Sequence, residues 1–368
     1  MRIMAALPLL LLLPVASSQV IPFYNELPEP QPWPSCGIEP VVFADAEVGF
    51  ENLHFLEGVL YLTAFEDGLY QAFANGRVEH ITTPDPGRNG PEVMGLASMD
   101  GALYVSQGLG VTTDVDGRVL RFPEPGLPAF EVFATGFGGA NGMVAAPDGH
   151  LYLAHGFRTE LYRIAPDGSW TTWAEGLVPN GLSLHPDGDR LVVGQVGELG
   201  SGVEAWSLAD PSQREQLFAF NAVNTGAPVA SDPGAPVVPH LMDDVAVTAD
   251  GRVLLTSHER FKTLMGDPAT GEACVLFEHA DSPTSVRVAE GFGSWDGMVF
   301  AVDLAGVIQA ADIGLMAAPS QGGEEGDLAD DAGAGDDGDE EAPGAGAAFI
   351  LLALALAAFV GRRRAGTT

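Results

Sequence analysis

The chain repeats one short pattern six times, and this repeat restricts the possible folds more than any other feature of the sequence. Each copy has an alternating segment, then a turn, then a run rich in β-branched and aromatic residues. The turns and second runs read EGVLYLTAF, DGALYVSQG, DGHLYLAHG, DGDRLVVGQ, DGRVLLTSH and DGMVFAVDL, and successive copies begin 39 to 63 residues apart. Alternation on both sides of a glycine-containing turn predicts a β-hairpin in every copy.

A third strand follows the hairpin in several copies, as in GRVLRF from Gly117 and TELYRIA from Thr159. Units of about 40 to 50 residues with three or four strands each are typical of propeller blades. The sequence therefore predicts an all-β fold, a six-bladed β-propeller, over residues 41–319. Because the first and last blades must meet, we expect the segment around Val41 to supply an outermost strand.

The two ends of the chain differ in composition from the repeats. Residues 1–18 predict a secretory signal peptide, and residues 19–40 an N-terminal arm. Residues 320–343, rich in Gly, Asp and Glu, predict a disordered linker. Residues 344–364 carry an apolar run and three arginines, which predicts a transmembrane or sorting helix. This tail resembles the sorting signals of bacterial surface proteins, so we expect an exported protein anchored outside the cytoplasmic membrane by its C-terminus.

The formal net charge of −34 argues against nucleic acid as a partner, because nucleic acids are bound through Lys and Arg. We expect a monomeric propeller that acts on small molecules. The sequence holds two cysteines, Cys36 and Cys274. In an oxidising compartment they can form one disulfide, and two free thiols are the alternative.

The first strand of each blade runs along the central channel of a propeller, so equivalent residues at its start should face one another. Counting back from each turn gives six positions: Glu51, Met94, Asn141, Asn180, Asp243 and Thr284. Five of these side chains contain oxygen. Two carboxylates and two amides around one point favour Ca²⁺, whereas zinc prefers His or Cys. Asn or Asp beside Gly also occurs as a simple turn or strand cap, which is the alternative for each residue alone.

The ends of the second strands should form another set at the same face, consisting of Gln107, His155, Gln195, His258 and Asp303. Hydrolysis needs a general base for water, and His155 and His258 are the candidates in this set. His240 is a third candidate, on a loop. A structural role for any single histidine stays open. The sequence has no GxSxG motif, which disfavours a serine nucleophile.

Several of these motifs together resemble the calcium-dependent lactonase propellers, which include gluconolactonase, regucalcin and the paraoxonases. They are Glu51-Asn52, the Asn-Gly at Asn141, PNGLSLHPDG around Asn180, and LMDDVAVTADGRVLLTSH from Leu241. The resemblance covers all six copies. It implies a catalytic calcium held by Glu51, Asn141, Asn180 and Asp243, with Asp244 added as in the paraoxonases, and Thr284 lining the site.

The resemblance also implies roles for residues beyond the proposed ligands. His258 resembles a site-lining histidine, and Asp243 or Asp244 can serve as the base in gluconolactonase-like members. Met94 departs from the paraoxonase pattern, which has a catalytic histidine there. Asn52 and Gly142 stand where those enzymes use carboxylates for a second calcium.

Two functions follow from these observations. One is a calcium-dependent hydrolase of lactones or esters, in which the metal polarises the carbonyl group. The other is a non-catalytic propeller that keeps calcium for rigidity and binds a ligand or partner. Met94 favours the second function, and the near-complete ligand set with two histidines favours the first.

Overall fold

The computed structural model describes residues 33–84, 92–108, 117–156, 159–175, 179–195, 202–219 and 242–315. All described residues belong to one compact unit. The predicted signal peptide, acidic linker and C-terminal helix lie outside the described residues. Within the described ranges, no helix has the length and apolar character needed to cross a membrane.

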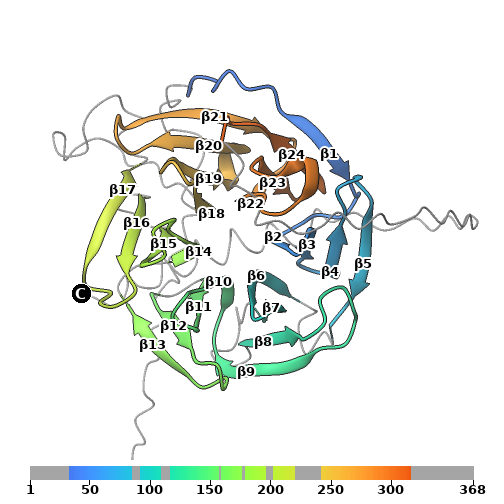
Figure 1. Cartoon of the computed structure of the whole chain (residues 1–368), viewed down its shortest axis with the longest axis vertical. Helices are drawn as coiled ribbons and strands as arrows, with labels where there is room; N and C mark the ends of the chain where they lie inside the picture. Colours follow the sequence, from blue (N-terminus) through green and yellow to red (C-terminus); the bar gives the residue numbers. More distant parts are fainter. Residues whose placement is uncertain are drawn as a thin grey trace, which may run out of the picture. The chain divides into compact units, whose positions relative to one another are not determined.

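The described residues form six antiparallel sheets of four strands each, which confirms the predicted six-bladed propeller (Figure 1). Blade 1 contains β2 (Asn52–Leu56), β3 (Val59–Ala64), β4 (Gly68–Ala72) and β5 (Val78–Thr82). Blade 2 contains β6 (Val93–Met99), β7 (Ala102–Gln107), β8 (Gly117–Phe122) and β9 (Glu131–Phe137). Blade 3 contains β10 (Ala140–Ala145), β11 (Leu151–His155), β12 (Leu161–Ile164) and β13 (Trp170–Ala174).

The remaining blades repeat this order. Blade 4 contains β14 (Pro179–Leu184), β15 (Arg190–Gln195), β16 (Gly202–Ser207) and β17 (Arg214–Ala219). Blade 5 contains β18 (Met242–Val247), β19 (Val253–Ser257), β20 (Lys262–Asp267) and β21 (Glu272–Glu278), with a short 3-10 helix, η1 (His258–Arg260), after β19. Blade 6 contains β22 (Pro283–Val288), β23 (Val299–Asp303), β24 (Val307–Ala311) and β1 (Val41–Asp45), with η2 (Gly293–Trp295) before β23.

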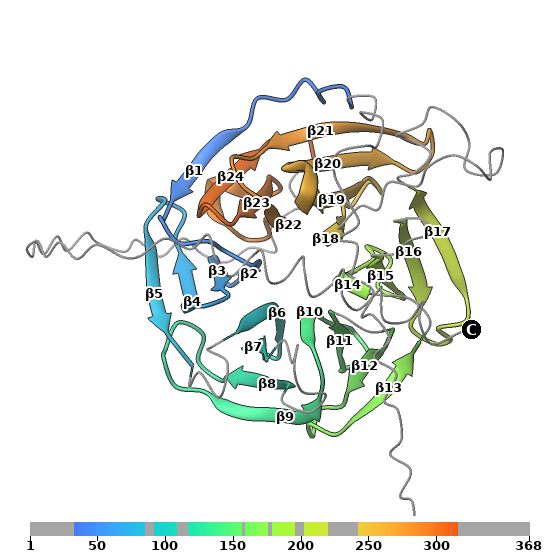
Figure 2. The same ribbon diagram turned by 180° about the vertical axis from the view of Figure 1, so that it is seen from behind.

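The inner strands of the six blades lie side by side around the propeller axis. Each contacts the next in chain order, β2 with β6 and so on to β22, and β22 contacts β2 again. Figures 1 and 2 show this closed circle of blades from its two faces. The first residues of all six inner strands therefore meet at one end of the axis.

Blade 6 is completed by the segment around Val41, as the sequence predicted. Strand β1 pairs antiparallel with β24, with Val41 opposite Ala310. Its Phe43 ring packs edge-on against Phe300 of β23 at a centroid distance of 5.2 Å. Phe50, Phe292 and Phe300 are fully buried where blades 1 and 6 meet. Apolar packing thus seals the junction at which the chain closes on itself.

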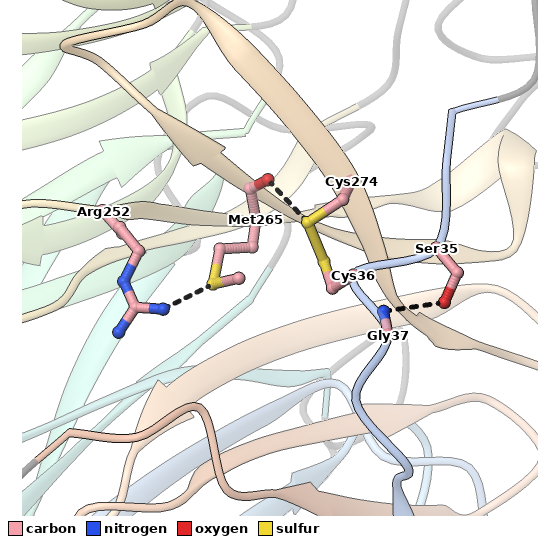
Figure 3. The surroundings of a disulfide bond; sticks show 6 residues. All are labelled: Ser35, Cys36, Gly37, Arg252, Met265 and Cys274. Carbon is pink, nitrogen blue, oxygen red and sulfur yellow. Dashed lines mark hydrogen bonds between the residues drawn. A yellow bond between two sulfur atoms is a disulfide. The ribbon is translucent and has the colours of Figure 1, made fainter.

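A disulfide joins Cys36 of the arm to Cys274 of β21, 238 residues away, which settles the alternative left open by the sequence (Figure 3). The arm runs parallel to β21 at this point. Cys36 N donates to Val275 O at 2.9 Å, and Val275 N donates to Pro34 O at 2.8 Å. The arm is therefore fixed to the outer edge of blade 5 before it enters blade 6.

The turns of blades 1 and 2 have the backbone conformation of a two-residue hairpin. Between β6 and β7, Asp100 and Gly101 have φ angles of 52° and 73°. Two consecutive residues with positive φ form the two-residue turn that matches the twist of antiparallel strands. The turn fixes how far each inner strand extends back from it, and this is why counting from the turns locates equivalent residues.

Candidate metal and active site at the starts of the inner strands

The six predicted positions, here called the ring, fall at equivalent points of the fold. Glu51 directly precedes β2. The other five are each the second residue of their strand: Met94 of β6, Asn141 of β10, Asn180 of β14, Asp243 of β18 and Thr284 of β22. Because the inner strands adjoin one another, the ring residues of neighbouring blades are also neighbours.

A β-bulge frees the ring residue from strand pairing in blades 2 to 6. In blade 4 the register moves from Pro179, opposite Gln195, to Leu182, opposite Val193. Equivalent register shifts occur in β6, β10, β18 and β22. A bulge redirects side chains out of the regular alternation, and bulges are common beside active sites. Asn180 and its equivalents are thereby left out of the regular pairing between the first and second strands of the blade.

Glycine follows the ring residue in blades 2, 3 and 4 because the inner strands approach too closely for a side chain. A Cβ atom at Gly142 would lie 2.3 Å from Asn180 O, and one at Gly181 would lie 2.4 Å from Asp244 Cα. The repeated Asn-Gly of the sequence thus has two functions. The asparagine occupies the ring position, and the glycine leaves room for the backbone of the inner strand in the next blade.

Asn180, Asp243 and His258 form one connected polar group. Asn180 Nδ2 donates to Asp243 Oδ1 at 3.0 Å and to Met242 O at 3.3 Å. His258 Nδ1 lies 3.6 Å from Asp243 Oδ2. The Asp243 and His258 side chains are 15% and 20% exposed, so water can reach both. Blades 4 and 5 therefore bring an amide, a carboxylate and an imidazole together at one accessible point.

Glu51 is buried close to these carboxylates. Burial raises the pKa of the Glu51 carboxyl well above its usual value, and the charges of Asp243 and Asp244 raise it further. A buried carboxylate among like charges is unfavourable unless a cation compensates it. The arrangement therefore fits a bound metal ion.

The donor atoms also fit calcium. Asn180 Oδ1 is buried and has no hydrogen-bond partner, which costs about 1 to 3 kcal/mol if nothing binds it. Calcium prefers carboxylate and amide oxygens. In the described part of the chain, no group of three or more His, Cys, Asp or Glu side chains is arranged to hold a metal. An ion at the ring would therefore need oxygens other than carboxylates, and Asn180 Oδ1 is one of them.

Asp244 has a different environment from Asp243. Its Oδ2 accepts hydrogen bonds from Ser285 Oγ at 2.5 Å, from Val286 N at 3.2 Å and from Arg287 Nη1. Its Oδ1 accepts one from Val245 N at 2.9 Å. Burial raises the pKa of the Asp244 carboxyl, and Arg287 acts against this shift. Both oxygens of Asp244, a predicted ligand and base, thus already accept hydrogen bonds.

The three remaining ring residues, Met94, Asn141 and Thr284, are buried. The Met94 side chain is apolar and only 2% exposed, so it offers neither a proton donor nor a strong ligand. Thr284 is 1% exposed, and its hydroxyl donates to Phe50 O at 2.7 Å. Thr284, predicted to line the site, therefore holds the backbone next to Glu51.

The second predicted set consists of the residues at the ends of the second strands, and one of them, His258, lies one residue beyond its predicted position. The ends of the second strands pair with the first residues of the inner strands, as Gln107 does with Val93 and His155 with Ala140. In blade 5, however, Ser257 is opposite Met242, and His258 is one residue further on. Helix η1 begins at His258 and turns the chain, which brings this side chain to Asp243.

The other predicted histidines are less accessible. His155 is 4% exposed, and its ring packs 6.2 Å from that of Tyr162. His240 lies outside the described residues, as does the side chain of Gln195. Asp303 is fully buried and lies 3.2 Å from His279 Nδ1, a residue that the sequence pattern did not single out. His258 Nδ1 is thus beside the ring carboxylate of Asp243, whereas His155 is opposite Ala140, the residue before Asn141.

No family model and no curated protein matches the sequence. Solved structures do match. A luciferin-regenerating enzyme aligns at 13% identity with a TM-score of 0.56, covering 76% of this chain and 97% of that one. A gluconolactonase from Xanthomonas campestris aligns at 15% identity with a TM-score of 0.54, covering 77% and 94%. A further protein assigned as a gluconolactonase aligns at 17% identity with a TM-score of 0.53, covering 76% and 93%.

The chain has the fold of these propellers. The resemblance predicted from short motifs is therefore confirmed at the level of the fold. At 13 to 17% identity the likeness does not extend to a particular reaction. The reaction has to be inferred from the ring and its neighbours.

Proposed function

We propose that this protein is an exported hydrolase of lactones or esters that uses calcium bound at the ring. The proposal depends on one observation: Asn180, Asp243 and His258 are in contact next to the buried carboxyl of Glu51. The shared fold with gluconolactonases is consistent with this reaction class.

The proposed ligands of calcium are Glu51, Asn141, Asn180 and Asp243. They supply only oxygen donors, and one of these, Asn180 Oδ1, lacks a partner within the protein. The chemistry that calcium supplies at such a site is polarisation of a carbonyl group. Asp244 is not included, because its oxygens already accept hydrogen bonds from Ser285, Arg287 and the backbone.

His258 is the proposed general base. Its Nδ1 faces the Asp243 carboxylate. This carboxylate stabilises the imidazolium that forms when the imidazole accepts a proton from water. Asp243 is held in place on its other side by the Asn180 amide. Asp243 itself is the alternative base, because its Oδ2 is partly accessible to water.

The buried Met94 favours a second candidate function. An apolar thioether in the ring contributes nothing to proton transfer. A propeller that binds calcium for rigidity and holds a ligand without turnover would tolerate methionine at this position. The two candidates differ in whether substrate is consumed.

The deciding experiment measures hydrolysis of γ-lactones, δ-lactones and phenyl acetate by the purified protein, in calcium and in EGTA. We expect turnover in calcium, loss of turnover in EGTA, and loss in Asp243→Asn. The matched control is Asp312→Asn, since this exposed carboxylate only accepts a hydrogen bond from Gly314 N at 2.8 Å. Calcium binding without turnover supports the second candidate, and absence of both contradicts the two proposals together.

Export remains part of the proposal. The Cys36–Cys274 disulfide supports it, because disulfides persist in oxidising compartments. The signal peptide at 1–18 and the anchoring segment at 344–364 are proposed from the sequence. Fractionation of cells producing the protein, with and without residues 344–364, tests the anchor directly.

A further inference from the structure

Arg287 of blade 6 donates hydrogen bonds to groups in three blades. Its Nη1 donates to the Asp244 carboxylate and to Val245 O at 3.2 Å in blade 5, and to Val286 O at 2.7 Å in its own blade. Its Nη2 donates to Leu182 O in blade 4 at 3.2 Å. The side chain is 15% exposed and that of Asp244 is 2% exposed. The ion pair is therefore largely removed from water.

The atoms around the guanidinium are of the kind that bind hard cations. They comprise one carboxylate oxygen and three backbone carbonyl oxygens. Ser285 Oγ, which also contacts Asp244, lies 3.4 Å from Asn52 Oδ1 in blade 1. Carboxylate, carbonyl and hydroxyl oxygens in this mixture are typical ligands of calcium. In this protein the guanidinium of Arg287, and not a metal ion, supplies the positive charge among these oxygens.

We propose that the Arg287 guanidinium is a resident cation of the propeller axis that occupies a potential second metal site and keeps Asp244 out of the ring. A metal at the ring then has Glu51 and Asp243 as its carboxylate ligands. The assignment of Glu51 and Asp243 as metal ligands rests on the proposed function. The role of Arg287 as the cation beside Asp244 does not.

The pairing also positions the ring. Asp243 and Asp244 are adjacent in β18, and Asp244 N donates to Thr256 Oγ1 at 2.8 Å. When Arg287 fixes the Asp244 carboxylate, the bulge that carries Asp243 is fixed too. Arg287 is thus a positioning residue that does not itself contact substrate.

The test counts calcium ions bound by Arg287→Ala relative to the wild-type protein. Calcium-free protein is titrated with CaCl₂ in a calorimeter, and bound metal is checked by elemental analysis. Removing the guanidinium leaves room for an ion, so we expect Arg287→Ala to bind one more equivalent than the wild type. Arg287→Met is the matched control, because it removes the charge but keeps the position filled, and it should gain none.

The double variant Asp244→Asn/Arg287→Ala should lose the added equivalent. The proposal is overturned if folded Arg287→Ala binds the same number of calcium ions as the wild type. It is also overturned if the double variant keeps the additional calcium ion. The comparison is relative to wild type, so it holds even if the wild-type protein hydrolyses nothing. Absence of hydrolysis contradicts the proposed function alone.

A second measurement covers the case in which Arg287→Ala does not fold without metal. Urea midpoints in EGTA are compared for Asp244→Asn, Arg287→Met and their combination. An isolated buried charge destabilises more than removal of the whole pair, so the double variant should lose less than the sum of the singles. Additive losses would overturn the role of the pair. Recovery of Arg287→Ala folding by calcium supports it.

Discussion

Asn180 of blade 4 donates a hydrogen bond to Asp243 of blade 5 at 3.0 Å, although the two residues are 63 positions apart in the chain. This contact crosses the boundary between two blades at the start of their inner strands. It leaves the other atom of the amide group, Oδ1, buried without a partner. Asn180 therefore both orients a carboxylate and offers an oxygen to a ligand.

The first prediction concerns this asparagine. Replacement of Asn180 by Ala should weaken calcium binding by about 10- to 100-fold, since it removes one ligand and the group that orients another. Isothermal titration calorimetry measures the change. Asn75→Ala is the control, because Asn75 only accepts a hydrogen bond from Arg77 N in an exposed turn. Unchanged affinity in Asn180→Ala would remove this residue from the ligand set.

The second prediction separates the base from the ligands. His258→Gln should lower kcat by about 10²- to 10⁴-fold, the usual contribution of a general base, while the calcium stoichiometry stays the same. Asp243→Asn should lose both turnover and metal. The exposed His80 of β5 provides the control His80→Gln. Full kcat in His258→Gln would assign the base to Asp243.

The third prediction concerns the close contact between inner strands. Gly142→Ala should destabilise the protein by about 1 to 3 kcal/mol, because its Cβ would lie 2.3 Å from Asn180 O and the backbone would have to move. Gly194→Ala is the control, since its Cβ would meet Val245 Cγ1 at an ordinary 3.4 Å. Urea denaturation without calcium measures the loss in the free energy of unfolding. The same measurement with calcium shows whether the variant still gains stability from calcium bound at the ring. Equal losses in the two variants would refute the steric explanation.

The fourth prediction is an acid-sensitive step in stability. Burial and the positive charge of Arg287 lower the pKa of His54 to about 4, whereas the unfolded chain binds a proton near pH 6.5. The unfolded state therefore holds more protons between these values, so the free energy of unfolding falls as the pH drops through that window. The side chain is only partly buried, and we expect a loss of about 1 to 2 kcal/mol.

The measurement is urea denaturation in EGTA at pH 7.5 and pH 4.5. His54→Gln keeps a polar group that can reach Ser98 Oγ, which lies 2.8 Å from His54 Nε2. This variant should lose less stability at low pH than the wild type. His80→Gln, at an exposed position of β5, should behave as the wild type does. The same pH response in all three proteins would show that other groups cause the acid sensitivity.

The fifth prediction concerns the disulfide. Replacing Cys36 and Cys274 by Ser should lower the free energy of unfolding by about 2 to 4 kcal/mol, because the bridge closes a long loop and restricts the unfolded chain. Reduction of the wild-type protein should have the same effect and should add nothing to the double variant. Guanidinium denaturation with and without a phosphine reductant measures both. Hydrolysis under native conditions should persist, since the bridge lies at the outer edge of blade 5.

The sequence predicted the blades and the ring because both follow from the hairpin turns. Asn180 precedes Asp187 of its turn by a fixed number of residues, and the same count locates Asn141 and Asp243. The bulges were not predictable from alternation. The position of His258 follows from the hairpin instead: Ser257 lies seven residues after Asp250, as His155 lies seven after Asp148, so Ser257 and not His258 is opposite Met242.

Arg287 was missed because a charged residue in an alternating strand normally faces solvent. Comparison between blades contained a signal. Three residues after the ring position, the other blades have His54, Ala97, Val144, Ser183 and Ala246. An arginine among mostly small residues in strands that converge on one axis indicates a buried partner, and the neighbouring Asp244 supplies it.

The first strand of the propeller is synthesised long before the strand that it pairs with. Val41 and Val307, which begin β1 and β24, are 266 residues apart, so the N-terminal strand stays unpaired until the final repeat has been made. Cys36 can be oxidised correctly only after Cys274 is available. A chain that ends before Cys274 therefore has both an N-terminal strand without its partner and a Cys36 thiol without its partner.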